Sequence, residues 1–213
     1  MSCYYLGVAF RRGSPDSWND VLVMESTGGQ YVHTELFLQS GERARFYTSY
    51  DASRRPCAIT CTSRRLPLLP NWEAVRFPVS ARTYKVAYAL ILQLMTLPIP
   101  YNHRDLWQCA VPLLLPFERD LDCMDVNTWA GPGVFCSQFC LLMLRRLVNQ
   151  GGLHAEPSLR QRLFAANSRG CSPNTLHQLL LETKRGGSPS TLQKKGTKAG
   201  VPNSGADAST TRE

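Results

Sequence analysis

The pattern of apolar and polar residues changes along the chain, from short alternating runs near the amino terminus to longer helical periods after residue 80. Short runs rich in branched and aromatic residues, bounded by glycine, proline or serine, are typical of strands. This pattern predicts strands at Cys3–Phe10, Val21–Glu25, Tyr31–Leu38, Ala44–Tyr50 and Trp72–Val79. The basic segment Asp51–Asn71 lacks alternation and is predicted to be irregular.

The run Tyr31–Leu38 alternates most clearly. Successive side chains of a strand point to opposite faces, so one face is predicted to carry Val32, Thr34, Leu36 and Leu38. The other face is predicted to carry Tyr31, His33, Glu35 and Phe37. His33 and Glu35 are therefore expected to lie close enough for the carboxylate to influence the imidazole.

Helical spacing of apolar residues begins after Ser80, a good N-cap residue. It predicts helices at Ala81–Leu97, Arg104–Ala110, Pro157–Ala166 on an exposed arm, and Thr175–Lys184. A further helix is predicted after a turn built on Gly131, Pro132 and Gly133, in the stretch that ends at Leu147. Strands followed by helices indicate an α+β fold, with a small antiparallel sheet or half-barrel packed on a central helix. One domain is expected over residues 1–185, and the polar segment 186–213 is predicted to be a disordered tail.

The segment after the Gly131–Gly133 turn is apolar on nearly every side until Arg145, which predicts a buried central helix. Cys136 falls in its opening turn, where unpaired backbone N–H groups and the helix dipole stabilise an anion. A thiolate there should have a lowered pKa. The alternative is that Cys136 and Cys140, one turn apart on the same face, are ordinary core cysteines.

Composition sets the cellular context. With 213 residues and 43% hydrophobic content, the chain can bury one sizeable core. The apolar run Cys3–Phe10 precedes the first arginines, unlike a secretory signal, so a reducing, cytoplasmic environment and eight free thiols are expected. The apolar segments are too short to span a bilayer. The net charge of +8 favours an anionic partner such as nucleic acid, an acidic protein or a membrane surface.

A thiolate nucleophile needs a base, and imidazole is the usual one. The chain has four histidines. His154 lies in a glycine-rich turn and His177 on a helix predicted to face solvent, whereas His103 is a second candidate. His33 is the best candidate because it lies on a regular strand with Glu35 beside it. The alternative is that His33 lies on the solvent face of a sheet.

Three short motifs in this order resemble the circularly permuted papain-like fold of the NlpC-type superfamily, in particular its branch of bacterial amidase-like proteins and relatives from large DNA viruses. They are His33-Thr34-Glu35-Leu36, Phe135-Cys136-Ser137-Gln138-Phe139 and Cys171-Ser172-Pro173-Asn174-Thr175-Leu176. In that branch the histidine strand precedes the cysteine helix, as it does here. The resemblance covers roughly Tyr4 to Glu182, and it would place a viral protein in the host cytoplasm.

The resemblance implies that Cys136 is the nucleophile, His33 the base, and the Cys136 N–H part of an oxyanion hole. The residue that orients the histidine would be Glu35, with Thr48 as the alternative. Gln138 stands where a glutamate is common in the branch. The implied activity is that of a cysteine peptidase or amidase that cleaves an amide or ester, with no cofactor and no metal. The apolar stretch Val111–Phe117 would suit a lipid chain or an apolar side chain, or would simply anchor a buried loop.

Three other readings remain open. The Cys57/Cys61 and Cys136/Cys140 spacings suit a zinc site. An inactive papain-like scaffold could bind nucleic acid or a host protein. A membrane-surface acyltransferase, similar to the lecithin retinol acyltransferase relatives in the same superfamily, would keep the chemistry of Cys136 and His33.

Overall fold

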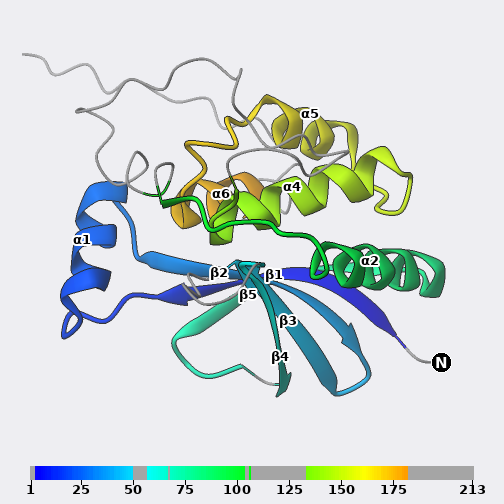
Figure 1. Cartoon of the computed structure of the whole chain (residues 1–213), viewed down its shortest axis with the longest axis horizontal. Helices are drawn as coiled ribbons and strands as arrows, with labels where there is room; N and C mark the ends of the chain where they lie inside the picture. The colour runs from blue at the N-terminus through cyan, green and yellow to red at the C-terminus, as the bar shows by residue number, and fades with distance from the viewer. Residues whose placement is uncertain (1–2, 50–56, 67, 104–105, 107–132, 182–213) are drawn as a thin grey trace, which may run out of the picture.

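The computed structural model describes residues 3–49, 57–66, 68–103, 106 and 133–181. Over these residues the chain has an α+β fold, with one five-stranded antiparallel sheet and five helices (Figure 1). The α+β class predicted from the sequence is therefore confirmed. The predicted tail 186–213, the stretch Val111–Phe117 and the helix Arg104–Ala110, apart from Leu106, lie outside the described residues.

The sheet has the strand order β4-β3-β2-β1-β5, and every neighbouring pair is antiparallel. Gly41, with a φ of 62°, makes the tight turn between the second and third strands. The strands are β1 (Tyr4–Arg12), β2 (Tyr31–Ser40), β3 (Arg43–Ser49), β4 (Ile59–Arg65) and β5 (Trp72–Val79). Four of the five were predicted. The segment predicted to be irregular is corrected, because its residues 59–65 pair with β3 as the edge strand of the sheet.

The predicted strand Val21–Glu25 is wrong, because these residues lie inside helix α1, Trp18–Thr27. The Ser17 hydroxyl accepts a hydrogen bond from the Asp20 amide at 3.3 Å, and Gly28 ends the helix with a φ of 63°. A serine cap at one end and a left-handed glycine at the other are helix signals. They outweigh the strand propensity of a short apolar run.

The remaining helices are α2 (Ala81–Leu94), α4 (Cys136–Asn149), α5 (Pro157–Ala165) and α6 (Pro173–Leu181). They lie on one side of the sheet, whereas α1 lies at the end of β1 and β2 (Figure 1). The predicted cap of α2 is confirmed, since the Ser80 hydroxyl accepts a hydrogen bond from the Thr83 amide at 3.0 Å. The exposed arm is corrected: α5 buries Leu159 and Leu163 in the core beside α4.

Helix α4 is the centre of the main hydrophobic core, as predicted. Every residue from Cys136 to Leu144 is buried, and the helix packs on β2 and β3. Each fully buried leucine, methionine or phenylalanine stabilises the fold by roughly 1.5–3 kcal/mol. The N-terminus of α4, and with it the backbone of Cys136, is therefore held by the core.

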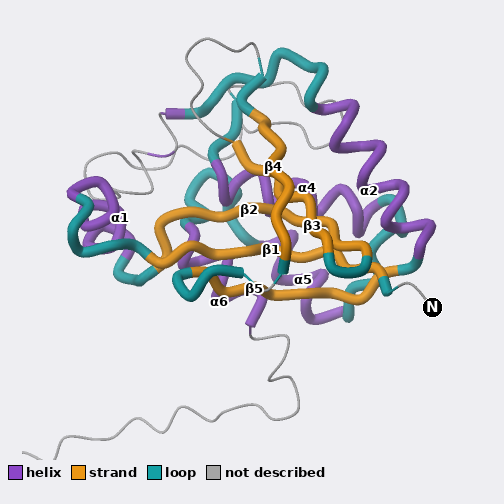
Figure 2. Tube along the Cα trace, turned by 90° about the horizontal axis from the view of Figure 1, so that it is seen from below, coloured by secondary structure: helices purple, strands orange, loops and turns teal. Residues whose placement is uncertain are grey.

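The alternation predicted for β2 is confirmed from Thr34 onward. Leu36 and Leu38 pack in the core under the helices, whereas Phe37 joins a smaller cluster with Phe46 on the opposite face of the sheet. Figure 2 shows the strands of the sheet from below. That smaller cluster also includes Trp72 as a partly buried member. The face that carries His33 and Glu35 is thus partly covered.

Tyr31 departs from the predicted alternation. The ladder between β1 and β2 is irregular where Arg12 pairs with Tyr31 and Arg11 with His33. Such a bulge inserts one residue and turns its neighbour to the other face. Tyr31 therefore lies in the core, where its ring packs against that of His177 with centroids 4.3 Å apart.

Candidate active site

The chain reaches α4 through a tightly fixed segment. Gly133 has a φ of 105°, and a Cβ atom at this position would lie 2.3 Å from the Pro100 carbonyl oxygen. The next residue, Val134, donates its N–H to that oxygen at 3.1 Å, and its own carbonyl accepts a hydrogen bond from the Ser49 hydroxyl at 2.7 Å. These contacts fix where α4 begins relative to the ends of β3 and of the 100–102 segment.

Cys136 is the first residue of α4, as the sequence predicted. Phe135 is the N-cap, and its N–H donates to the Gln138 side-chain oxygen at 3.4 Å. The N–H groups of the first helical turn have no acceptor within the helix. They point along the helix axis toward the side on which an anion at Cys136 would be stabilised.

The side chain of Asn174 fixes the start of β2, the strand that carries His33. The Asn174 side chain accepts from the Tyr31 N–H at 2.9 Å and donates to the Tyr31 carbonyl at 3.0 Å. It also donates to the Thr27 hydroxyl at 2.7 Å. Asn174, on helix α6, thus connects the end of α1 to Tyr31 at the start of β2. Tyr31 lies two residues before His33.

The structure brings Cys136 and His33 together. The Cys136 sulfur interacts with the His33 imidazole and with the amide and hydroxyl of Thr34. The ladder between β2 and β3 begins at Leu36, so Thr34 lies beyond that ladder. Cys136 is 4% exposed, and the His33 side chain is 21% exposed.

The two groups shift each other's pKa in opposite directions. Burial raises the pKa of the Cys136 thiol, but the charge and hydrogen bond of His33, together with hydrogen bonds from Thr34, outweigh burial and lower it. Burial lowers the pKa of His33, but the Cys136 thiolate and Glu35 raise it to about 9. This arrangement stabilises a thiolate–imidazolium pair relative to the neutral thiol and imidazole.

Neighbouring cysteines behave differently. Cys140, one turn along α4, donates its S–H to the Thr34 hydroxyl at 3.7 Å, and burial raises its pKa well above the ordinary value. Burial likewise raises the pKa of Cys171 to about 12. The core-cysteine interpretation therefore fits Cys140 and Cys171, whereas Cys136 has the surroundings of a nucleophile.

Both residues predicted to orient the histidine lie at its Nε2 atom. The Thr48 hydroxyl is 3.3 Å from Nε2, and the nearer Glu35 oxygen is 3.7 Å away. Glu35 is buried, and Arg64 binds both of its oxygens, at 2.7 and 2.8 Å. The guanidinium of Arg64 lies over the rings of Phe46 and Trp72, each 5.0 Å from its centroid.

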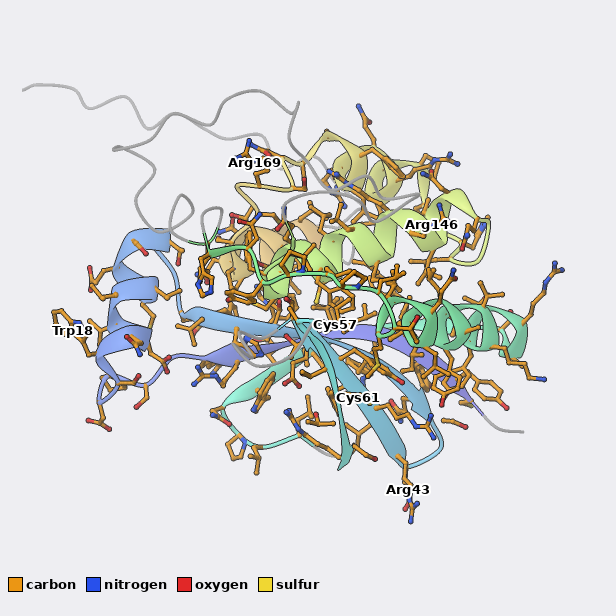
Figure 3. The ribbon with its side chains drawn as sticks, viewed as in Figure 1. Trp18, Arg43, Cys57, Cys61, Arg146 and Arg169 are labelled. Atoms are coloured by element: carbon orange, nitrogen blue, oxygen red, sulfur yellow. The ribbon has the colours of Figure 1, made fainter. Side chains whose placement is uncertain are left out.

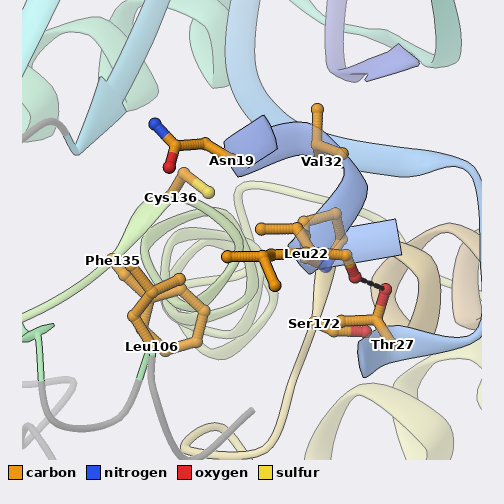
Figure 4. A pocket seen from close by; sticks show the side chains of 10 residues that line it. Asn19, Leu22, Thr27, Val32, Leu106, Phe135, Cys136 and Ser172 are labelled. Atoms are coloured by element: carbon orange, nitrogen blue, oxygen red, sulfur yellow. Dashed lines mark hydrogen bonds between the residues drawn. The ribbon is translucent and has the colours of Figure 1, made fainter. Parts of the chain in front are cut away.

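A pocket of about 190 Å³ opens beside Cys136 (Figure 4). Its walls are mainly apolar and come from α1, β2, the start of α4 and the start of α6. The lining residues are Asn19, Leu22, Val23, Thr27, Val32, Leu106, Phe135, Cys136, Ser172 and Pro173. The sulfur, although nearly buried, can therefore be approached through this pocket.

The other histidines lie elsewhere. His103 is exposed and packs on Tyr101 with ring centroids 4.9 Å apart, and His154 is exposed. The prediction that His177 faces solvent is wrong: it is buried, and its Nε2 lies 3.0 Å from Glu73. The bulge turns Tyr31 toward α6, where the Tyr31 ring packs on His177 and helps to bury it.

Cys57 and Cys61, whose spacing suits a zinc site, lie in two different environments. Cys57 is buried and donates to the Leu94 carbonyl at 3.5 Å, whereas Cys61 is exposed on β4 (Figure 3). Within the described ranges, no group of three or more histidine, cysteine, aspartate or glutamate side chains could hold a metal ion.

Sequence reasoning did not identify Arg64 or Asn174 as part of the site. Arg64 was counted only as positive charge, although its place in a run of polar residues is compatible with an edge strand. Asn174 directly precedes the predicted helix Thr175–Lys184 and was named only as part of a motif. No local signal in the sequence shows that either residue contacts β2.

No family model, curated protein or solved structure matches the chain. None of the helices in the described part of the chain combines the length and apolar character needed to span a membrane.

Proposed function

We propose that the protein is a thiol hydrolase of the permuted papain-like class, in which Cys136 attacks the carbonyl carbon of an amide or ester and His33 moves the proton. The observation that carries the proposal is the contact between Cys136 and His33 at the N-terminus of a buried helix, with the pKa of the thiol lowered and that of the imidazole raised. The order of the histidine strand before the cysteine helix, and the packing of the sheet on that helix, agree with this class.

In the proposed reaction the Cys136 thiolate forms a bond to the carbonyl carbon, and the electron pair of the carbonyl moves to oxygen. The N–H of Cys136 stabilises this oxyanion. Collapse breaks the bond to the leaving nitrogen or oxygen, which takes its proton from the His33 imidazolium. Neutral His33 then removes a proton from water, which attacks the thioester and releases the acid, and the thiolate–imidazolium pair is restored.

Thr48 and Glu35 act in this proposal as positioning residues for His33. Thr48 supplies a hydrogen-bonding oxygen at Nε2, whereas Glu35 supplies negative charge that Arg64 partly neutralises. A carboxylate shared with an arginine stabilises the imidazolium less than a free carboxylate would. The imidazolium can then still give up its proton to the leaving group.

The test combines alkylation with hydrolysis. Iodoacetamide at pH 7, followed by mass-spectrometric mapping, should label Cys136 before the other cysteines. Hydrolysis of p-nitrophenyl acetate should be lost in Cys136→Ala and retained in Cys61→Ala, a matched control at an exposed cysteine. If Cys61 is labelled while Cys136 stays unmodified, the hydrolase proposal fails and an inactive binding scaffold becomes the better explanation.

A further inference from the structure

The pocket beside Cys136 indicates which part of a substrate it would hold. A general acid must lie at the leaving group, so in the proposed reaction the leaving group is at His33. His33 is not among the described residues that line the pocket, whereas Cys136 is. The pocket therefore lies on the acyl side of the scissile bond, and whatever fills it stays attached to the sulfur in the acyl-enzyme.

Asn19 lies beside Cys136 at one end of the pocket, where its amide faces the reacting group (Figure 4). The rest of the pocket wall offers little to a polar ligand. Among the lining residues that the structure describes, Thr27 donates its hydroxyl to the Val23 carbonyl at 2.7 Å and accepts from Asn174. The Ser172 hydroxyl is bound by Thr175, at 2.9 Å from its hydroxyl and 3.1 Å from its amide. A peptide backbone placed beside Thr27 and Ser172 would lose hydrogen bonds to water without replacing them.

We propose that the pocket selects an unbranched aliphatic acyl group, so that the favoured substrate is a medium-chain acyl ester or amide. This inference rests on the proposed hydrolase function and adds the substrate class. A volume of about 190 Å³ has room for roughly six groups the size of a water molecule, at about 30 Å³ each. An acyl chain of about six carbons fills it.

The experiment measures kcat/KM for p-nitrophenyl esters from acetate to decanoate. Burial of each methylene should raise kcat/KM about fourfold up to roughly six carbons, after which the rise stops. The ester of N-acetyl-leucine, which brings a peptide amide, should react more slowly than the hexanoate. Equal rates for acetate and hexanoate, or a faster reaction of the leucine ester, would overturn the inference.

Two variants separate the pocket from the nucleophile. Leu22 is 40% exposed at the pocket wall, and Leu92 is 44% exposed on α2, away from it. Leu22→Ser should lower kcat/KM for the hexanoate about fourfold relative to that for the acetate, because roughly one methylene of the longer chain loses its contact. Leu92→Ser should change neither. If the acetate acylates Cys136 but the rates do not depend on chain length, only the pocket inference is rejected. If no ester acylates Cys136, the proposed hydrolase function is rejected as well.

Discussion

Replacement of His33 by alanine should remove the nucleophilic character of Cys136 at neutral pH. The pKa of His33 is raised from 6.5 to about 9, which corresponds to a net stabilisation of the imidazolium by about 3 kcal/mol. The attraction between two charges acts equally on both, so the same interaction lowers the pKa of Cys136. Without it, burial leaves the thiol with a pKa at or above the ordinary value of about 8.5.

The size of the effect follows from the fraction of thiolate. In His33→Ala at pH 6.5, at most about 1% of Cys136 is ionised, so its alkylation by iodoacetamide should slow, by up to roughly 100-fold, the limit for a parent that is fully thiolate. As the pH rises, Cys136 of His33→Ala ionises as well, so the difference between the two rates should shrink. In the parent, the ion pair exists from the lowered pKa of Cys136 up to about pH 9, where His33 loses its proton and hydrolysis should fall.

The assay follows alkylation of Cys136 by mass spectrometry between pH 5 and 10. His154→Ala is the matched control, because His154 is exposed and lies outside the site. Its rates should equal those of the parent at every pH. Equal rates for the parent and His33→Ala at pH 6.5 would refute the ion pair.

Two further predictions concern residues that support the site. Arg64→Gln leaves the full charge of buried Glu35 to His33, so the alkaline limb of the pH profile of hydrolysis should move to higher pH, and addition of Glu35→Gln should reverse that move. An unchanged limb would show that Arg64 has no part in setting the site. Asn174→Ala removes three hydrogen bonds and leaves the Tyr31 backbone unpaired, so urea unfolding should show a loss of about 3 kcal/mol. A loss under about 1 kcal/mol would contradict this role.

Much of the candidate site was predictable because its main residues lie where local rules apply. Cys136 follows a Gly-Pro-Gly turn at the start of an apolar helix, and His33 lies on the most regular strand. Thr48 and Glu35 were both named as partners, and both lie near Nε2 of His33. Local periodicity is sufficient for such placements.

The features that were missed depend on contacts between distant segments. Residues 59–65 form a strand only because β3 offers an edge, and few of their side chains are apolar. The bulge that turns Tyr31 inward, and with it the burial of His177, appears only when β1 and β2 pair. Helix α1 was missed for a different reason, since its caps at Ser17 and Gly28 lie outside the short apolar run Val21–Glu25 from which a strand was predicted.

The position of Cys140 one turn behind Cys136 gives the protein two thiols that report different events. Cys140 is fully buried, is hydrogen bonded to Thr34 and has a raised pKa, so a reagent reaches it only when the core opens. Its labelling rate therefore measures the free energy of that opening, as hydrogen exchange does for a buried amide. A single labelling time course thus separates variants that lose chemistry at Cys136 from variants that lose the folded state around it.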